Sequence, residues 1–106
     1  MTFDMMRQEL RDVREYYCLK DALSEIEGEK ELDLSALKKK AAKYNKVIVK
    51  ASPKLIRLYH ALYIKGISQN KVASAWSYTP EYIRQLCRKL EEFLFEQINQ
   101  SQKEIS

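Results

Sequence analysis

Side chains that can read the edges of base pairs gather in the C-terminal third of the chain. Arginine, glutamine and glutamate commonly hydrogen-bond base edges in the major groove of DNA. In a helix that starts near residue 79, four such residues fall opposite the apolar side: Glu81, Arg84, Gln85 and Arg88. The apolar stripe consists of Ile83, Leu86, Cys87, Leu90, Phe93, Leu94 and Ile98. The pattern predicts an amphipathic helix whose polar face is free to contact nucleic acid.

Three consecutive residues mark the start of this helix. Thr79 can accept a hydrogen bond from the first turn, and Pro80 suits the first helical position. Glu81 places a carboxylate near the positive end of the helix dipole. About 20 residues at ~1.5 Å each would make a rod of roughly 30 Å. We therefore expect a helix over residues 79–98, with its polar N-terminal half projecting from the protein.

A shorter helix is expected just before it, from Ser68 to about Ala75. Gly66 can end the preceding helix, and Ser68 can cap the next one. Ser77 and Tyr78 then supply a short turn into the long helix. The sequence therefore predicts a helix-turn-helix. Val72 and Trp76 can point to the core, and the small Ala73 permits close approach between the two helices.

The spacing of small, turn and aliphatic residues in this unit resembles the last conserved region of bacterial sigma factors. Ala73 is followed four residues later by Ser77, and Ile83 is followed directly by Arg84 and Gln85. Together with its small size and helical N-terminal part, this makes the chain most similar to phage late-gene transcription activators of the ArpU and RinA type. The resemblance implies a helix-turn-helix like sigma region 4, without a winged β-hairpin.

The resemblance covers about residues 53–98 and implies a role for particular side chains. Six residues would face promoter DNA: Thr79, Glu81, Tyr82, Arg84, Gln85 and Arg88. Two more would meet backbone phosphates: Ser68 and Lys71. The chain departs from the family pattern at three positions. They are Ser77, where glycine or asparagine is common, Lys71, where glutamate is common, and Glu91, where an apolar residue is common.

Two further helices are expected in the N-terminal part. Apolar residues at spacings of three and four predict an amphipathic helix over about residues 2–27, which ends near Gly28. A lysine-rich helix is expected over about residues 34–50, with Asp33 or Ser35 as its cap. Four lysines form its expected solvent face: Lys38, Lys39, Lys40 and Lys43.

These helices suggest two parts of the chain. Residues 1–52 would form a helical part for packing or dimerisation, and residues 53–106 the DNA-binding unit, whose first helix covers 53–65 after a Ser52 cap. Phe95 lies about 120° from the apolar stripe and should be exposed in the isolated unit. Either the N-terminal helix covers this surface within one chain, or the surface binds a second copy or another protein.

The formal net charge of +4 combines three unlike segments. Residues 1–33 carry a net charge of −5, residues 34–80 carry +10 without a single carboxylate, and residues 81–106 carry −1. The positive charge of this long segment is suited to binding a polyanion such as nucleic acid. Alternatively, the acidic first helix packs on the basic second helix and neutralises it, and both interpretations can hold in part.

Signals for other classes of protein are weak. Cys18 and Cys87 have no CxxC partner, and His60 has no suitably spaced ligand, so we expect no metal site, no disulfide and no cofactor. Three carboxylates are expected to form a solvated helix face: Glu91, Glu92 and Glu96. We therefore expect no enzyme activity. The apolar runs are too short for a signal peptide or a membrane span, which favours the cytoplasm. The resemblance to sigma factors and phage activators implies that this is a bacterial cytoplasm.

The sequence thus predicts an all-α, sequence-specific transcription regulator that binds double-stranded DNA. Dimerisation and contact with RNA polymerase stay open as further interactions. The main alternative is a helical module that docks on RNA polymerase or another regulator. The apolar residues Tyr16, Tyr17 and Phe95 favour this alternative. The face with Arg84, Gln85 and Arg88 favours DNA. A DNA-packaging adaptor is a third possibility without specific residue support.

Overall fold

A computed structural model describes residues 1–25 and 34–105 of the chain. Every element in these ranges is helical, so the all-α prediction is confirmed. The elements are α1 (Phe3–Glu25), α2 (Ser35–Ile48), α3 (Pro53–Tyr59), a π-helical turn η1 (His60–Ile64), α4 (Gln69–Ala75) and α5 (Pro80–Ile105). None of these helices combines the length and the apolar character that crossing a bilayer requires.

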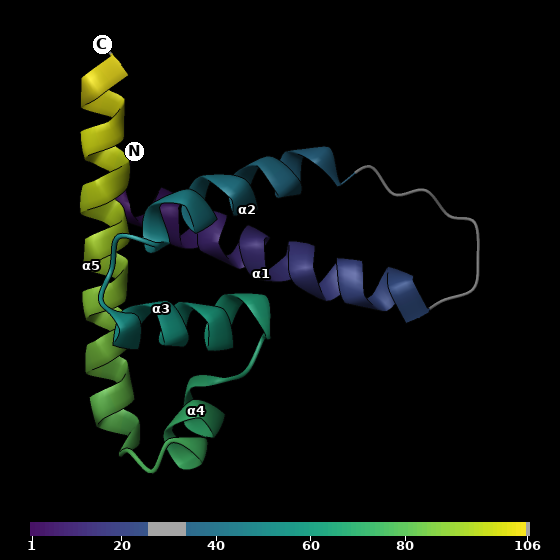
Figure 1. Ribbon diagram of the computed structural model, residues 1–106, viewed down its shortest axis with the longest axis vertical. Helices are drawn as coiled ribbons and strands as arrows, with labels where there is room; N and C mark the ends of the chain where they lie inside the picture. Colours follow the sequence, from purple (N-terminus) through teal and green to yellow (C-terminus); the bar gives the residue numbers. More distant parts are fainter. Residues whose placement is uncertain (26–33, 106) are drawn as a thin grey trace.

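The long helix α5 is the axis of the molecule (Figure 1). Helices α1 and α2 lie side by side against it, and α3 and α4 lie against the half that contains its N-terminus. The whole protein measures 43 × 42 × 22 Å, so it is flat. One hydrophobic core joins residues on either side of position 52. Its largest fully buried side chains include Met6, Leu10, Tyr44, Leu58, Tyr59, Ile83, Leu90 and Leu94.

The predicted caps start three of the helices. Thr79 Oγ1 accepts a hydrogen bond from the backbone N–H of Tyr82 at 3.1 Å, at the start of α5. Ser68 Oγ accepts one from the N–H of Lys71 at 3.3 Å, at the start of α4. Ser52 caps α3 in the same way. These caps could be predicted from the sequence because a cap involves only residues within one helical turn.

The helix bounds differ from the predicted ones at several ends. The N-cap of α2 is Leu34, which makes no side-chain cap bond, and the alternative cap Asp33 lies outside the described residues. The segment that follows Asn45 stays helical to Ile48, as predicted, and then turns. Helix α5 continues seven residues past position 98 to Ile105, because the added residues are mostly good helix formers without glycine or proline.

The first helix of the expected DNA-binding unit does not stay α-helical to its end. Residues His60–Ile64 widen into a π-helical turn, which no local signal in the sequence predicted. Gly66 then ends the helix with φ of +68°, and the N–H of Ile67 bonds to the carbonyl of Ala61 at 2.9 Å. The prediction of a helix-ending glycine at position 66 is therefore confirmed.

The apolar face of α1 is buried within the same chain. Its residues Met6, Leu10 and Val13 are at most 1% exposed in the shared core. Phe3 meets Phe95 of α5 edge to face, with the ring centroids 5.4 Å apart. Of the alternatives left open by the sequence, covering by the N-terminal helix is the one observed.

The turn between α4 and α5 contains a strained residue. Ser77 adopts φ of +60°, a left-handed conformation that costs an L-residue free energy. Around it, the N–H of Tyr78 bonds to the carbonyl of Ala73 at 2.9 Å, and the N–H of Ser77 bonds to that of Ser74 at 3.3 Å. These two bonds form a Schellman motif, in which the left-handed position usually holds glycine. The turn predicted at Ser77 is thus present, with serine in the position that favours glycine.

We expect Ser77→Gly to raise the free energy of unfolding by about 1 kcal/mol, because glycine adopts positive φ without steric cost. Ser77→Val should lower it, since a β-branched residue is poorly tolerated there. Urea denaturation measures both effects. Ser74→Gly inside α4 is the control and should be destabilising by about 0.5 kcal/mol. A loss of stability in Ser77→Gly would contradict the left-handed turn.

The contact between Phe3 and Phe95 can be tested with a double-mutant cycle. Alanine at both positions should reveal a coupling of about 0.5–1.5 kcal/mol in the free energy of unfolding. Phe93 points to another side of α5, since two residues turn a helix by about 200°. The control cycle of Phe3 with Phe93 should therefore be additive. Additive behaviour of Phe3 with Phe95 would mean that α1 does not cover this part of α5.

Candidate nucleic-acid interface

The N-terminal half of α5 presents a polar face. Burial of Ile83 and Leu90, each 0% exposed, fixes the rotation of this helix about its axis. The residues on the opposite side are all exposed: Glu81, Arg84, Gln85 and Arg88. The structure therefore brings four of the predicted contact residues together on three successive turns. Such a face can donate and accept hydrogen bonds along a groove of DNA.

The start of α4 holds the two residues expected at backbone phosphates. Ser68 and Lys71 are both exposed. The Ser68 hydroxyl oxygen accepts the cap bond from the Lys71 N–H. Thr79, at the start of α5, is likewise exposed and uses its side-chain oxygen as a cap. All three residues are accessible to a ligand. The hydroxyl oxygens of Ser68 and Thr79 also accept the N-cap hydrogen bonds of their helices.

Tyr82 is placed differently from its neighbours in the predicted set. It is half-buried, and its hydroxyl accepts a hydrogen bond from Lys54 Nζ of α3 at 2.9 Å. Its ring lies 4.7 Å from that of Tyr78, centroid to centroid, with Lys54 over both rings. The bond to Tyr82 raises the pKa of Lys54. Tyr82 thus faces α3, while the arginines on α5 face elsewhere.

The lysine face of α2 is partly neutralised by α1. Lys40 pairs with Asp12 at 2.7 Å, and Lys43 pairs with Glu9 at 3.1 Å. The hydroxyl of buried Tyr44 also donates to Glu9 at 2.6 Å. Lys40 and Lys43 are therefore not part of a plain solvent face. For these two lysines the structure shows the alternative left open by the sequence, in which acidic residues of α1 neutralise α2. Three other lysines of α2 are exposed: Lys38, Lys39 and Lys46.

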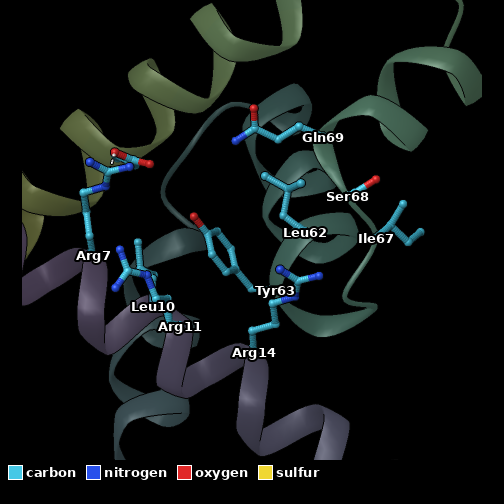
Figure 2. A pocket seen from close by; sticks show the side chains of 10 residues that line it. Arg7, Leu10, Arg11, Arg14, Leu62, Tyr63, Ile67, Ser68 and Gln69 are labelled. Carbon is cyan, nitrogen blue, oxygen red and sulfur yellow. Dashed lines mark ion pairs between the residues drawn. The ribbon is translucent and has the colours of Figure 1, made fainter. Parts of the chain in front are cut away.

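The other edge of α1 carries three arginines that were not among the predicted site residues. Arg7, Arg11 and Arg14 line a pocket between α1 and the segment that joins η1 to α4. Figure 2 shows them along α1, facing Ser68 and Gln69 across the pocket. Their spacing of four and three residues was visible in the sequence. The net charge of −5 over residues 1–33 conceals this basic edge.

Glu91 belongs to this pocket and corrects another expectation. The sequence placed it on a solvated face with Glu92 and Glu96, but only 16% of its side chain is exposed. Its carboxylate pairs with Arg7 at 3.5 Å, marked by the dashed line in Figure 2. Burial raises the pKa of Glu91, and Arg7 and Arg88 oppose this rise. The packing of α1 on α5 explains the burial. The sequence offered this packing as one alternative for Phe95, but it did not indicate that the packing would reach Glu91.

Side chains suited to covalent or metal chemistry are dispersed. Cys18 and His60 are exposed on different helices. Cys87 lies in the core, as predicted, where burial raises the pKa of its thiol to about 11. Within residues 1–25 and 34–105, no three His, Cys, Asp or Glu residues gather in a way that could hold a metal ion.

The buried carboxylate predicts a pH effect on stability. The pKa of Glu91 is higher in the folded protein than its usual 4.5, so the folded state binds more protons between these two values. Its contribution to stability therefore falls as the pH rises through that window. We expect the difference in unfolding free energy, Glu91→Gln minus parent, to increase between about pH 4 and pH 7.

Urea denaturation at several pH values measures this difference. The exposed neighbour supplies the control variant Glu92→Gln, which removes a carboxylate from the solvent side of α5. A difference for Glu91→Gln that does not change with pH would show that Arg7 fully compensates for the burial.

Comparison with known proteins adds no relative to this description. No family model, no curated protein and no solved structure matches the chain. A functional assignment must therefore rest on the geometry and charge of the described residues.

Proposed function

We propose that the chain is a sequence-specific DNA-binding transcription regulator that acts in the bacterial cytoplasm. In this proposal α4, the turn at Ser77 and α5 act as a helix-turn-helix, and α5 enters the major groove. One observation carries the proposal, namely the exposed polar face of α5 on a helix whose opposite side is fully buried. Four residues form this face: Glu81, Arg84, Gln85 and Arg88.

The dimensions of α5 suit this role. Its 26 residues correspond to roughly 39 Å at ~1.5 Å per residue. The major groove, about 12 Å wide, admits one α-helix. The N-terminal turns of α5 can therefore occupy the groove while the C-terminal turns stay packed on the rest of the protein. Because Leu90 and Leu94 anchor α5, its polar face is presented by a rigid element.

Further positive charge lies on the elements between α2 and α5. Although α1 neutralises part of α2, four cations after α2 are exposed on α3, in the η1–α4 connection and on α4: Lys54, Arg57, Lys65 and Lys71. Residues 34–80 contain no carboxylate of their own. Cations in this arrangement favour a polyanion and would give the salt-dependent part of the affinity for DNA.

The alternative of a protein-docking module loses two of its supports. Tyr16 is buried in the core, and Phe95 packs on Phe3, so these apolar residues are used within the chain. Tyr78 is 40% exposed and remains available to a partner such as RNA polymerase. Trp76 is partly covered by the guanidinium of Arg57, 5.1 Å from its ring centroid. The DNA interpretation is therefore better supported.

A binding selection tests the proposal directly. The purified chain is mixed with a pool of random-sequence duplexes at two salt concentrations, and the bound fraction is sequenced. An enriched motif whose binding weakens with salt would support a specific regulator, and a palindromic motif would add that it binds as a dimer. Salt-sensitive binding without enrichment would contradict sequence specificity. Absence of binding at low salt would favour the protein-docking alternative.

We expect Arg84→Ala to reduce discrimination between the selected site and mismatched sites by ~1–3 kcal/mol, if Arg84 bonds a base edge. Lys71→Ala is the matched variant and should weaken binding to all sequences alike, because phosphate contacts carry no sequence information. Titration of both variants against matched and mismatched duplexes measures these effects. Equal losses on every sequence for Arg84→Ala would make it a phosphate contact, and a changed site preference for Lys71→Ala would contradict its role.

A further inference from the structure

Helix α1 separates its charges onto two edges. Glu9 and Asp12 point to α2, where they pair with lysines. Arg7, Arg11 and Arg14 fall within about 60° of one another on the other edge, since each residue turns the helix by ~100°. This edge faces η1 and the start of α4. The arginines are thus directed toward the part of the protein assigned to DNA binding.

The pocket between these elements has an uneven charge. Leu10, Leu62 and Tyr63 form its apolar lining, and burial raises the pKa of the Tyr63 hydroxyl, which keeps it neutral. The other lining residues are Arg7, Arg11, Arg14, Ile67, Ser68, Gln69 and Glu91. Three guanidinium groups therefore meet a single carboxylate, so the pocket carries excess positive charge.

The three arginines make different contacts. Arg14 donates to the carbonyl of Gly66 at 2.9 Å and so supports the turn that ends η1. Arg7 pairs with Glu91 of α5. Arg11 is exposed and donates to the amide oxygen of Gln8, its neighbour on α1, at 3.0 Å. Arg11 thus contributes charge to the surface without joining one helix to another through this bond.

This pocket continues into the polar face of α5. A second hollow is lined by Phe3, Arg7, Gln69, Arg84, Cys87, Arg88, Glu91 and Glu92. Arg7, Gln69 and Glu91 line both hollows, so the two are adjacent. A concave strip therefore runs from the arginines of α5 past the start of α4 to the arginines of α1.

We propose that the arginine edge of α1 binds the phosphodiester backbone of the same DNA duplex whose major groove receives α5. This inference rests on the proposed function. A helix in the major groove has a phosphate strand along each side, and the strand beside the start of α4 would cross the strip toward α1. Guanidinium groups suit this ligand because their planar donors match phosphate oxygens. On this proposal α1 extends the DNA-binding surface beyond the helix-turn-helix.

The test uses Arg11→Ala in the full chain, with the duplex obtained by selection. The logarithm of the DNA affinity falls linearly with the logarithm of the salt concentration, and each lost phosphate contact makes this line less steep by about 0.9. The fall in affinity between roughly 50 and 200 mM salt should then be smaller by a factor of about 3.5. Affinity should decrease alike for matched and mismatched duplexes, and Arg11→Lys should restore much of the salt slope.

The control is Lys39→Ala, which removes the same charge from an exposed position on α2. Its salt slope should equal that of the parent chain. If Arg11→Ala and Lys39→Ala change the slope equally, only the overall charge matters and the proposal fails. If Arg11→Ala changes site preference instead, Arg11 meets a base and the proposal fails as well.

Other outcomes separate this proposal from the proposed function. Specific binding with an unchanged slope in Arg11→Ala would overturn the role of α1 and leave the helix-turn-helix proposal intact. Absence of DNA binding by the parent chain would overturn both. Thermal unfolding with inorganic phosphate provides the remaining comparison. Phosphate could stabilise the parent chain but not Arg11→Ala, while the salt dependence of DNA binding is the same for both. That result would show that the pocket binds a free anion, and it would overturn the proposal that α1 binds the DNA backbone.

Discussion

Burial of the apolar stripe of α5 is the interaction on which the rest of the structure depends. Ile83, Leu90 and Leu94 are each 0% exposed, and α1, α2, α3 and α4 all pack on this one helix. Burying such side chains is worth about 1.5–3 kcal/mol each relative to exposure, so the rotation of α5 about its axis is firmly set. The same rotation that buries the stripe exposes Arg84 and Arg88. Stability and the candidate binding face therefore have one cause.

The charges of α1 follow from its position between two different neighbours. Its acidic edge meets the lysines of α2, and its arginine edge meets the turn at Gly66 and the carboxylate of Glu91. Each edge thus has partners of suitable polarity, and the apolar face between them enters the core. The net charge of a segment cannot describe such an arrangement, because opposite charges on different edges of one helix act on different surroundings.

Local features of the sequence predicted the caps at Ser68 and Thr79, the glycine at position 66 and the buried stripe, since each depends on neighbours within a few turns. The polar face of α5 followed from the same periodicity. The burial of Glu91 and the arginine edge of α1 could not be predicted in this way, because both depend on how α1 docks. That docking joins residues far apart in the chain.

The π-helical turn His60–Ile64 also affects which deletions the helix before α4 can accommodate. A π-helical turn holds about one residue more than the α-helical turn it replaces. Losing a single residue there would let α3 continue as an ordinary α-helix. The turn that remains would still be one full turn of helix with one residue fewer, so the residues after the deletion would keep nearly the same rotation about the helix axis. In an ordinary α-helix the same deletion would rotate every later residue by about 100°, so the loss of one residue should be tolerated better within His60–Ile64 than within Pro53–Tyr59.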